Sequence, residues 1–247
     1  RKLRRRGVAE PGYLEHIDER FGRYRASVHP GSLWIHAVSL GETRAAAILV
    51  QELRRERPDL RVLLTHGTAT GRAEGVKLLR PGDAQAWLPW DTPQAVQRFL
   101  VHFQPAAGVL METEVWPNLA AACAAHGVPL ALANARLSEQ SLRKARRLPS
   151  LSRPAFASLR AVWAQTEADA RRLGQAGATV QEVLGNLKFD ATVDAQLLAR
   201  GQQWRAGAGR PVLLLASSRE GEEDLWLDAL QALKENPVDG QEHDAAP

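Results

Sequence analysis

The stretch "LWIHAVSLGETRAAAILVQELRRERPDLRVLLTH", residues 33–66, decides the fold. It opens with an apolar run, 33–38, and closes with another, 61–66, and neither run alternates with polar residues. Nearly continuous apolar runs are typical of strands that are covered on both faces. Between them, apolar side chains recur every three or four residues, which predicts an amphipathic helix. A helix that joins two such strands indicates that the strands pair in parallel.

The same alternation of strand and helix continues along the rest of the chain. Apolar runs of strand length recur, with helical patterns between them. This order indicates a parallel sheet with right-handed crossovers. We therefore predict an α/β fold with a doubly wound parallel sheet. The further predicted strands are 84–90, 107–112, 128–135, 161–166, 179–185 and 210–218.

A glycine-rich break divides the chain into unequal parts. After the helical stretch "LLARGQQWRAGAGRP", which ends at 211, only one more strand and one more helix are predicted, too few to bury a core of their own. We predict a basic lead-in at 1–30 and an α/β domain at 31–196. A linker with the first β/α unit of a second domain follows at 197–233, and a polar tail ends the chain at 234–247.

The composition excludes several classes of site. Hydrophobic residues make up 45% of the 247 residues, which is enough for a sizeable core. The single cysteine, Cys123, excludes a disulfide framework and a cysteine-based zinc site. The histidines are too scattered for a zinc signature, so we predict no metal. There is no apolar run of about 18 residues and no signal peptide, so we predict no transmembrane helix.

Positive charge is concentrated at the start of the chain. The net charge is +4, and the segment "RKLRRR" (1–6) is almost entirely basic. Such a cluster is either a solvated charge run or the cytosolic flank of a membrane anchor. The first residue is not methionine, so we expect a trimmed start. If the anchor interpretation holds, Arg1 to Arg6 face anionic lipid.

Polar, acidic and small residues follow nearly every predicted strand, as in "SLGET", "METEVWPN" and "NLKFD". The opposite ends of the strands are preceded by plain turns such as "RPDL" and "HGVP". Ligands of open parallel sheets bind outside the carboxyl ends of the strands. We therefore predict the functional site at that edge.

Glu42 admits two interpretations. Ser39 and Glu42 have the spacing of a capping box, in which the carboxylate only satisfies a backbone N–H at the start of a helix. Gly41, however, lets a ligand or backbone come close, and a carboxylate beside it faces the mouth of the cleft. A catalytic role and a capping role both remain open on the spacing alone.

Other strand ends carry similar pairs of interpretations. Glu112 and Glu114 suit acid/base chemistry, or they favour a helix N-terminus. Lys188 is either an ion-pair residue or a cation that neutralises a developing anion. Ser217, Ser218 and Arg219 fit an anion site and a simple helix cap equally well.

Six strings of the chain resemble the bacterial 3-deoxy-D-manno-octulosonic acid (Kdo) transferases. They occur in the family's order and spacing, and the likeness runs from about residue 15 to about residue 230. Six motifs in register are specific, whereas a lone "GET" is not. The strings are "HAVSLGET", "LPWDTPQAVQRFL", "METEVWPNL", "ANARLS", "GNLKFD" and "SSREGEE".

The resemblance implies a two-domain GT-B glycosyltransferase that transfers Kdo from CMP-Kdo to a lipid A precursor with inversion. It makes 31–196 the acceptor-side domain, and it implies no cofactor beyond the donor. Glu42 matches the catalytic base, while Glu114 and Lys188 match residues that stabilise the transition state. The remaining expected site residues are Ser39, Gly41, Asn134 and Arg136 on the acceptor side, and Ser217, Ser218 and Arg219 at the donor phosphate.

The family also implies a place in the cell. We expect an enzyme that is peripheral or anchored at the cytoplasmic face of the inner membrane. The family's apolar N-terminal anchor and most of its second domain are missing, so we expect an incomplete chain whose own activity is open.

Two other functions remain open. The first is a related GT-B transferase of the same pathway with another donor, such as a UDP-sugar. The second is a module that binds anionic lipid or nucleic acid without catalysis. Nucleic acid would need aromatic residues interleaved with basic ones in a groove, and Trp87 and Trp90 are the only such pair. We therefore expect no nucleic-acid partner.

Overall fold

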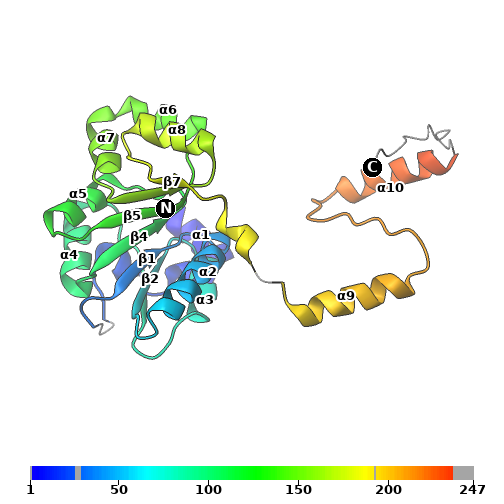
Figure 1. Ribbon diagram of the computed structural model, residues 1–247, viewed down its shortest axis with the longest axis horizontal. Helices are drawn as coiled ribbons and strands as arrows, with labels where there is room; N and C mark the ends of the chain where they lie inside the picture. The colour runs from blue at the N-terminus through cyan, green and yellow to red at the C-terminus, as the bar shows by residue number, and fades with distance from the viewer. Residues whose placement is uncertain (1, 26–28, 192, 236–247) are drawn as a thin grey trace. The chain divides into compact units, whose positions relative to one another are not determined.

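The computed structural model describes residues 2–25, 29–191 and 193–235, which form two compact units. The first unit, Arg1–Thr192, contains a parallel sheet of seven strands in the order β3-β2-β1-β4-β5-β6-β7 (Figure 1). The prediction of a doubly wound α/β fold is confirmed. The strands are β1 Leu33–His36, β2 Val62–His66, β3 Ala84–Trp87, β4 Ala107–Met111, β5 Leu130–Ala135, β6 Ala161–Ala164 and β7 Glu182–Val183.

Helices follow the strands as the apolar pattern predicts. From β1 to β3 the chain moves outward in one direction, and from β4 to β7 it moves in the other, so the direction switches between β1 and β4. Ligands of doubly wound sheets bind at this switch. The helices are α1 Lys2–Ala9, α2 Leu40–Glu56, α3 Ala69–Val76, α4 Pro93–Phe103, α5 Pro117–Ala125, α6 Glu139–Arg147, α7 Pro149–Ala157 and α8 Glu167–Ala176, with 3-10 turns η1 Pro11–Leu14, η2 Ile17–Phe21 and η3 Leu187–Asp190.

Each face of the sheet buries its own apolar cluster. Neighbouring residues of β1 point to opposite faces, as the pleat of a strand requires. Trp34 packs with α4, its ring 5.0 Å from that of Phe99, and belongs to the cluster that includes α4 to α8. Ile35 packs with Ala46 and Val50 of α2 on the other face. Burying a side chain of this size contributes roughly 1.5–3 kcal/mol.

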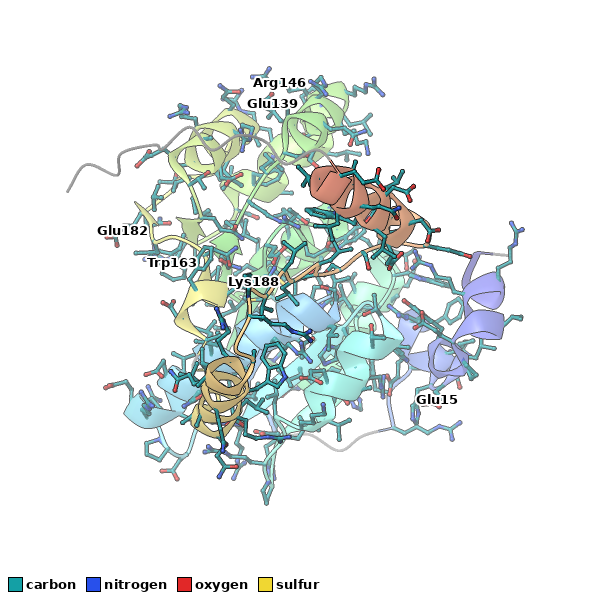
Figure 2. All side chains as sticks on the ribbon, turned by 90° about the vertical axis from the view of Figure 1, so that its right-hand side faces the viewer. Glu15, Glu139, Arg146, Trp163, Glu182 and Lys188 are labelled. Atoms are coloured by element: carbon teal, nitrogen blue, oxygen red, sulfur yellow. The ribbon has the colours of Figure 1, made fainter. Side chains whose placement is uncertain are left out.

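One face is only partly covered. Because the helices from α4 to α8 all lie on one side, an apolar groove of about 450 Å³ is left on the other side of the central strands. Val109 and Trp163 line it from the sheet, and Leu49 of α2 and Leu187 of η3 border it. Figure 2 labels Trp163 of the groove and Lys188, the residue that follows Leu187 in η3.

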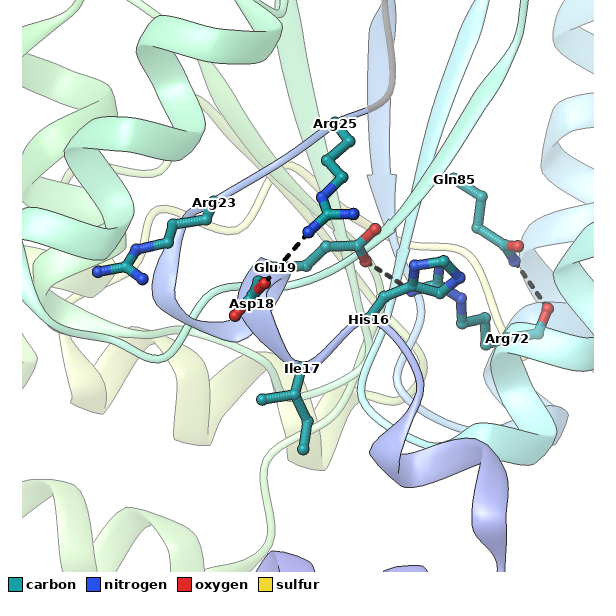
Figure 3. Close-up of a pocket in the computed structure, with 8 residues that line it drawn as sticks. All are labelled: His16, Ile17, Asp18, Glu19, Arg23, Arg25, Arg72 and Gln85. Atoms are coloured by element: carbon teal, nitrogen blue, oxygen red, sulfur yellow. Dashed lines mark hydrogen bonds and ion pairs between the residues drawn. The ribbon is translucent and has the colours of Figure 1, made fainter.

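The predicted lead-in contributes to the first unit. Glu19 of η2 accepts a hydrogen bond from Arg72 at 2.7 Å (Figure 3). It also accepts one from the Trp87 amide at 2.8 Å. Arg20 lies over the Trp87 ring at 4.1 Å and donates to the carbonyl of Gly67 at 2.9 Å. Glu19 and Arg20 of η2 therefore bind the chain at the ends of β2 and β3. Arg1, at the start of the basic cluster, and the tail residues 236–247 lie outside the described residues.

The second unit departs from the prediction. It contains α9 Ala195–Gly207 and α10 Glu222–Glu235. The predicted strand over 210–218 is wrong, because these residues are described and none of them is in a strand. A strand is stable only when its backbone groups pair with a neighbour. The described part of this unit offers no second strand, so an apolar run alone does not form one.

Two buried histidines lie side by side at the ends of β1 and β2. The His36 ring contacts the Thr65 hydroxyl at 2.9 Å, and the His66 ring contacts the Ala37 carbonyl at 3.0 Å. Burial, together with the neighbouring His66, lowers the pKa of His36 to about 3. Burial likewise lowers the pKa of His66 to about 4. Both side chains therefore stay neutral in the folded protein at neutral pH.

We predict that His36→Gln flattens the acid dependence of stability. Below pH 6.5 the unfolded chain binds a proton at His36 that the folded chain does not bind, so stability is present above that pH and is lost as the pH falls. Between pH 7.5 and pH 5 this loss amounts to about 2 kcal/mol for one histidine. Urea unfolding at the two pH values measures it. The matched control is His126→Gln, which changes an exposed histidine. If both variants lose the same stability between the two pH values, the prediction is contradicted.

Candidate functional site

Carboxylates and cations from four strand ends meet at the carboxyl edge of the sheet. Glu42 follows β1, Glu112 follows β4, and Arg136 and Lys188 follow β5 and β7. The Lys188 ammonium lies 3.0 Å from the Glu112 carboxylate. It also lies 3.9 Å from the point that a Cβ at Gly41 would occupy. Glycine at 41 therefore leaves room between the start of α2 and the cation.

The start of α2 holds Glu42 by both carboxylate oxygens. Ser39, the N-cap residue, accepts a bond from the Glu42 amide at 3.3 Å, and its hydroxyl donates to Glu42 Oε1 at 2.9 Å. The Val38 amide donates to Glu42 Oε2 at 2.9 Å. This is the reciprocal bonding of a capping box, shifted by one residue on the backbone side. The capping interactions therefore form, and they fix the orientation of the carboxylate at the same time.

The environment of Glu42 favours proton binding. Burial is the largest cause that raises its pKa, and the Glu112 carboxylate raises it further. The bonds from Val38 and Ser39 act in the opposite direction, and so does Arg136, but the net shift is upward. A carboxylate with a raised pKa is a stronger base than an ordinary carboxylate.

Glu114 lies beside Glu42 in a half-buried position. Its Oε2 accepts a bond from the Trp116 indole at 2.9 Å. Burial raises the pKa of Glu114, and the Glu42 carboxylate raises it further. α5 begins three residues later at Pro117, and Glu114 is not its N-cap residue. Glu42 and Glu114 thus lie at the same edge of the sheet, close enough for the Glu42 carboxylate to raise the pKa of Glu114.

Glu112 binds both cations of the site. Its side chain is 4% exposed, and it makes ion pairs with Arg136 Nε at 2.9 Å and Lys188 Nζ at 3.0 Å. Its backbone has a φ of +58°, which is uncommon for a residue other than glycine. A buried charge needs partners, and here one carboxylate compensates two cations. Sequence reasoning assigned Glu112 either an acid/base role or a place near a helix N-terminus, and it missed the pairing with two cations.

Asn134 connects β5 to η3. It is almost fully buried, has a φ of +51°, and accepts a bond from the Leu187 amide at 3.2 Å. Since Lys188 is the next residue, this bond fixes the backbone that carries the cation. Arg136 is the more exposed partner of Glu112, with 58% of its side chain accessible. The structure therefore places Asn134 in the interior and Arg136 at the exposed side of Glu112.

Ser217, Ser218 and Arg219 belong to the second unit. The Ser218 hydroxyl bonds to the Glu223 carboxylate, and the Arg219 amide donates to Glu222 at 2.9 Å. These contacts join Ser218 and Arg219 to the first two residues of α10, Glu222 and Glu223. The donor-phosphate role of these three residues stays a prediction.

The remaining sequence expectations concern thiols, metals and membranes. Burial raises the pKa of the Cys123 thiol to about 12, so this cysteine stays protonated inside the core. Within the described ranges, no three histidine, cysteine or carboxylate side chains gather closely enough to hold a metal ion. None of the helices that the structure describes is long and apolar enough to cross a bilayer.

Comparison with known proteins finds a family that matches most of this chain. The family model described as "3-Deoxy-D-manno-octulosonic-acid transferase (kdotransferase)" matches residues 15–191. The 3-deoxy-D-manno-octulosonic acid transferase of Bordetella pertussis is 51% identical over 224 residues, which are 87% of this chain and 52% of that protein. The enzyme of the same name from Haemophilus influenzae is 32% identical over 92% of this chain and 54% of its own length.

A solved structure supports the fold. UDP-GlcNAc 2-epimerase from Neisseria meningitidis superposes with a TM-score of 0.50 at 16% identity, covering 83% of this chain and 63% of the epimerase. At this identity the likeness concerns the fold alone. The chain spans about half the length of the two transferases that it matches. The family match covers most of the chain and includes every residue of the first unit's site, so the chain belongs to the Kdo transferase family.

Proposed function

We propose that this chain is the acceptor-side half of a glycosyltransferase that moves Kdo from CMP-Kdo to a lipid A precursor. The observation that carries the proposal is the oriented, half-buried Glu42 carboxylate beside Arg136 and Lys188. Family membership supports Kdo as the transferred sugar. The donor, the acceptor and the roles of single residues are our inference from the chemistry of the site.

Glu42 acts as the general base. The acceptor hydroxyl oxygen attacks the anomeric carbon of Kdo, and the hydroxyl proton passes to the Glu42 carboxylate. The bond from the anomeric carbon to the phosphate oxygen breaks on the opposite face, and its electron pair leaves with CMP. Attack and departure on opposite faces invert the anomeric centre. A positioned carboxylate contributes typically about 10²–10⁴-fold to such a step.

The two cations of the site stabilise negative charge. Kdo carries a carboxylate, and the departing CMP phosphate gains charge in the transition state. Lys188 and Arg136 are both paired with Glu112, so the cluster holds one net positive charge before Glu42 and Glu114 are counted. Glu114 shares the site with Glu42, and we assign its carboxyl group to stabilising the developing oxocarbenium centre. Positioned charges of this kind are a large term in transfer reactions.

Ser39, Gly41 and Asn134 position this machinery on the acceptor side. Ser39 orients the base, Gly41 keeps the entry open, and Asn134 fixes the backbone of η3. We propose that Ser217, Ser218 and Arg219 contact the donor phosphate in the complete enzyme. No cofactor other than the donor takes part in this mechanism, and the enzyme works at the cytoplasmic face of the inner membrane.

A fused protein tests the function. We predict that residues 1–192, joined to the remaining half of the Bordetella pertussis relative, transfer Kdo from CMP-Kdo to a lipid A precursor. The relative itself serves as the positive control, and the product is measured by mass spectrometry. Transfer from a UDP-sugar in place of CMP-Kdo would favour the related transferase. A folded fused protein with neither activity would contradict the proposal.

A further inference from the structure

A strongly basic turn lies between α6 and α7, outside the proposed catalytic site. Residues 143–153, "RKARRLPSLSR", contain five cations and no carboxylate, and we call this segment the basic elbow. Leu148 caps both the end of α6 and the start of α7. Figure 2 shows Arg146 on the outer side of α6. All five cations are exposed: Arg143, Lys144, Arg146, Arg147 and Arg153.

These cations have no carboxylate partner within the described residues. Arg146 donates only to the Gln175 amide oxygen, at 2.9 Å. Glu139, the acidic residue at the start of α6, pairs instead with Arg172 at 3.6 Å. Several other cations of the first unit do have a carboxylate partner. Such pairs include Arg44 with Glu74, Arg54 with Asp83, Arg72 with Glu19, and Arg136 with Glu112.

The elbow also exposes apolar side chains between its cations. Leu148 is 60% exposed and Leu151 is 54% exposed. The helices are already anchored to the core by other side chains, Leu142 of α6 and Phe156 of α7. One exposed leucine needs no explanation. Two exposed leucines among five cations without carboxylate partners are typical of a segment that binds at the headgroup boundary of a bilayer.

We propose that the basic elbow binds the surface of an anionic phospholipid bilayer, with Leu148 and Leu151 entering the headgroup boundary. Anionic lipid attracts each nearby lysine or arginine, and burial of the leucines adds an attraction that salt does not screen. The inference rests on the proposed lipid acceptor, because an enzyme that acts on a lipid must work at such a surface. Nucleic acid fits less well, because the elbow has no aromatic residue on which a base can stack.

The elbow is a different surface from the basic cluster at residues 1–6. In that cluster, Arg6 already stacks over the Tyr13 ring at 5.7 Å, and α1 packs against η1. Charge removal at the elbow alone therefore separates the two. A suitable variant replaces Arg143, Lys144 and Arg147 by glutamine, because no bond or ion pair of these side chains holds the described fold together.

The experiment measures co-sedimentation of the full 247-residue chain with vesicles of phosphatidylcholine, with or without phosphatidylglycerol. We expect the triple variant Arg143→Gln, Lys144→Gln, Arg147→Gln to lower binding to the anionic vesicles by about 10²-fold. The control variant Arg57→Gln, Arg61→Gln, Arg80→Gln removes the same charge from the segments that precede β2 and β3, and it should change binding far less. We expect Leu148→Ser with Leu151→Ser to lower the binding that persists at high salt.

Equal losses in the two triple variants would show that only net charge matters and would overturn the proposal. Unchanged binding of the elbow variant, with loss on charge removal at residues 2–6, would overturn it as well. Tighter binding to an oligonucleotide than to anionic vesicles, abolished by the same triple variant, would assign the elbow to nucleic acid instead. Vesicle binding requires no transfer activity, and transfer to a detergent-dispersed acceptor requires no vesicle, so the elbow and the proposed function fail independently.

Discussion

Glu42→Gln will lower the turnover rate of the fused transferase by at least about 10²-fold and leave the binding of CMP-Kdo nearly unchanged. Glutamine keeps the length of the side chain, and its carbonyl oxygen can still accept from the Val38 amide or the Ser39 hydroxyl. It cannot take the proton of the acceptor hydroxyl. The rate therefore falls because the base is lost, while the start of α2 remains intact.

Two further variants separate catalysis from capping. Ser39→Ala removes the cap but keeps the carboxylate, so it should cost about 1 kcal/mol of stability and much less of the rate. Glu42→Ala removes both. Turnover, donor affinity and urea unfolding are measured for each protein. If Glu42→Gln retains full turnover while Glu42→Ala is merely less stable, Glu42 is only a cap and the base must be another carboxylate.

Asp83→Ala will destabilise the chain by about 3–5 kcal/mol, because it leaves a buried guanidinium without its counter-charge. Asp83 pairs with Arg54, and their side chains are 2% and 5% exposed. Its other oxygen accepts from the Val62 amide at 2.8 Å, so the same carboxylate joins α2 to the start of β2. Its loss removes these bonds together.

Urea unfolding of the 247-residue chain measures the effect. The matched control is Glu52→Ala, which breaks the exposed pair of Glu52 with Arg55 on the same helix. Exposed pairs contribute at most about 1 kcal/mol. If both variants lose the same stability, burial does not determine the strength of the Arg54–Asp83 pair.

Sequence patterns predicted the sheet because its strands are buried on both faces. Runs such as residues 33–38 and 61–66 are mostly apolar and do not alternate with polar residues, and helix lies between them, so local information suffices to indicate strands. The same reasoning was wrong for residues 210–218, which are equally apolar. A strand forms only when a partner strand is present, and that condition is not local.

The site was predictable in position but not in detail. Strand order places Glu42 and Lys188 at one edge, and topology alone leads there. The role of Glu112 depends on its left-handed backbone and on two cations that follow other strands. The burial of Asn134 behind η3 depends on a similar bend. Neither conformation is encoded by the periodicity of the surrounding residues.

The position of β1 in the middle of the sheet has a consequence for synthesis on the ribosome. β1 pairs with β2 on one side, but its other edge stays open until β4 arrives, when Leu33 pairs with Ala107. During translation this edge is free for a time on the order of seconds, and open edges are where nascent chains associate wrongly. Glu42 emerges in the early half, whereas Arg136 and Lys188 emerge with the late half. Glu42 therefore lacks both cations until then, and the charged cluster is complete only after η3 has left the exit tunnel.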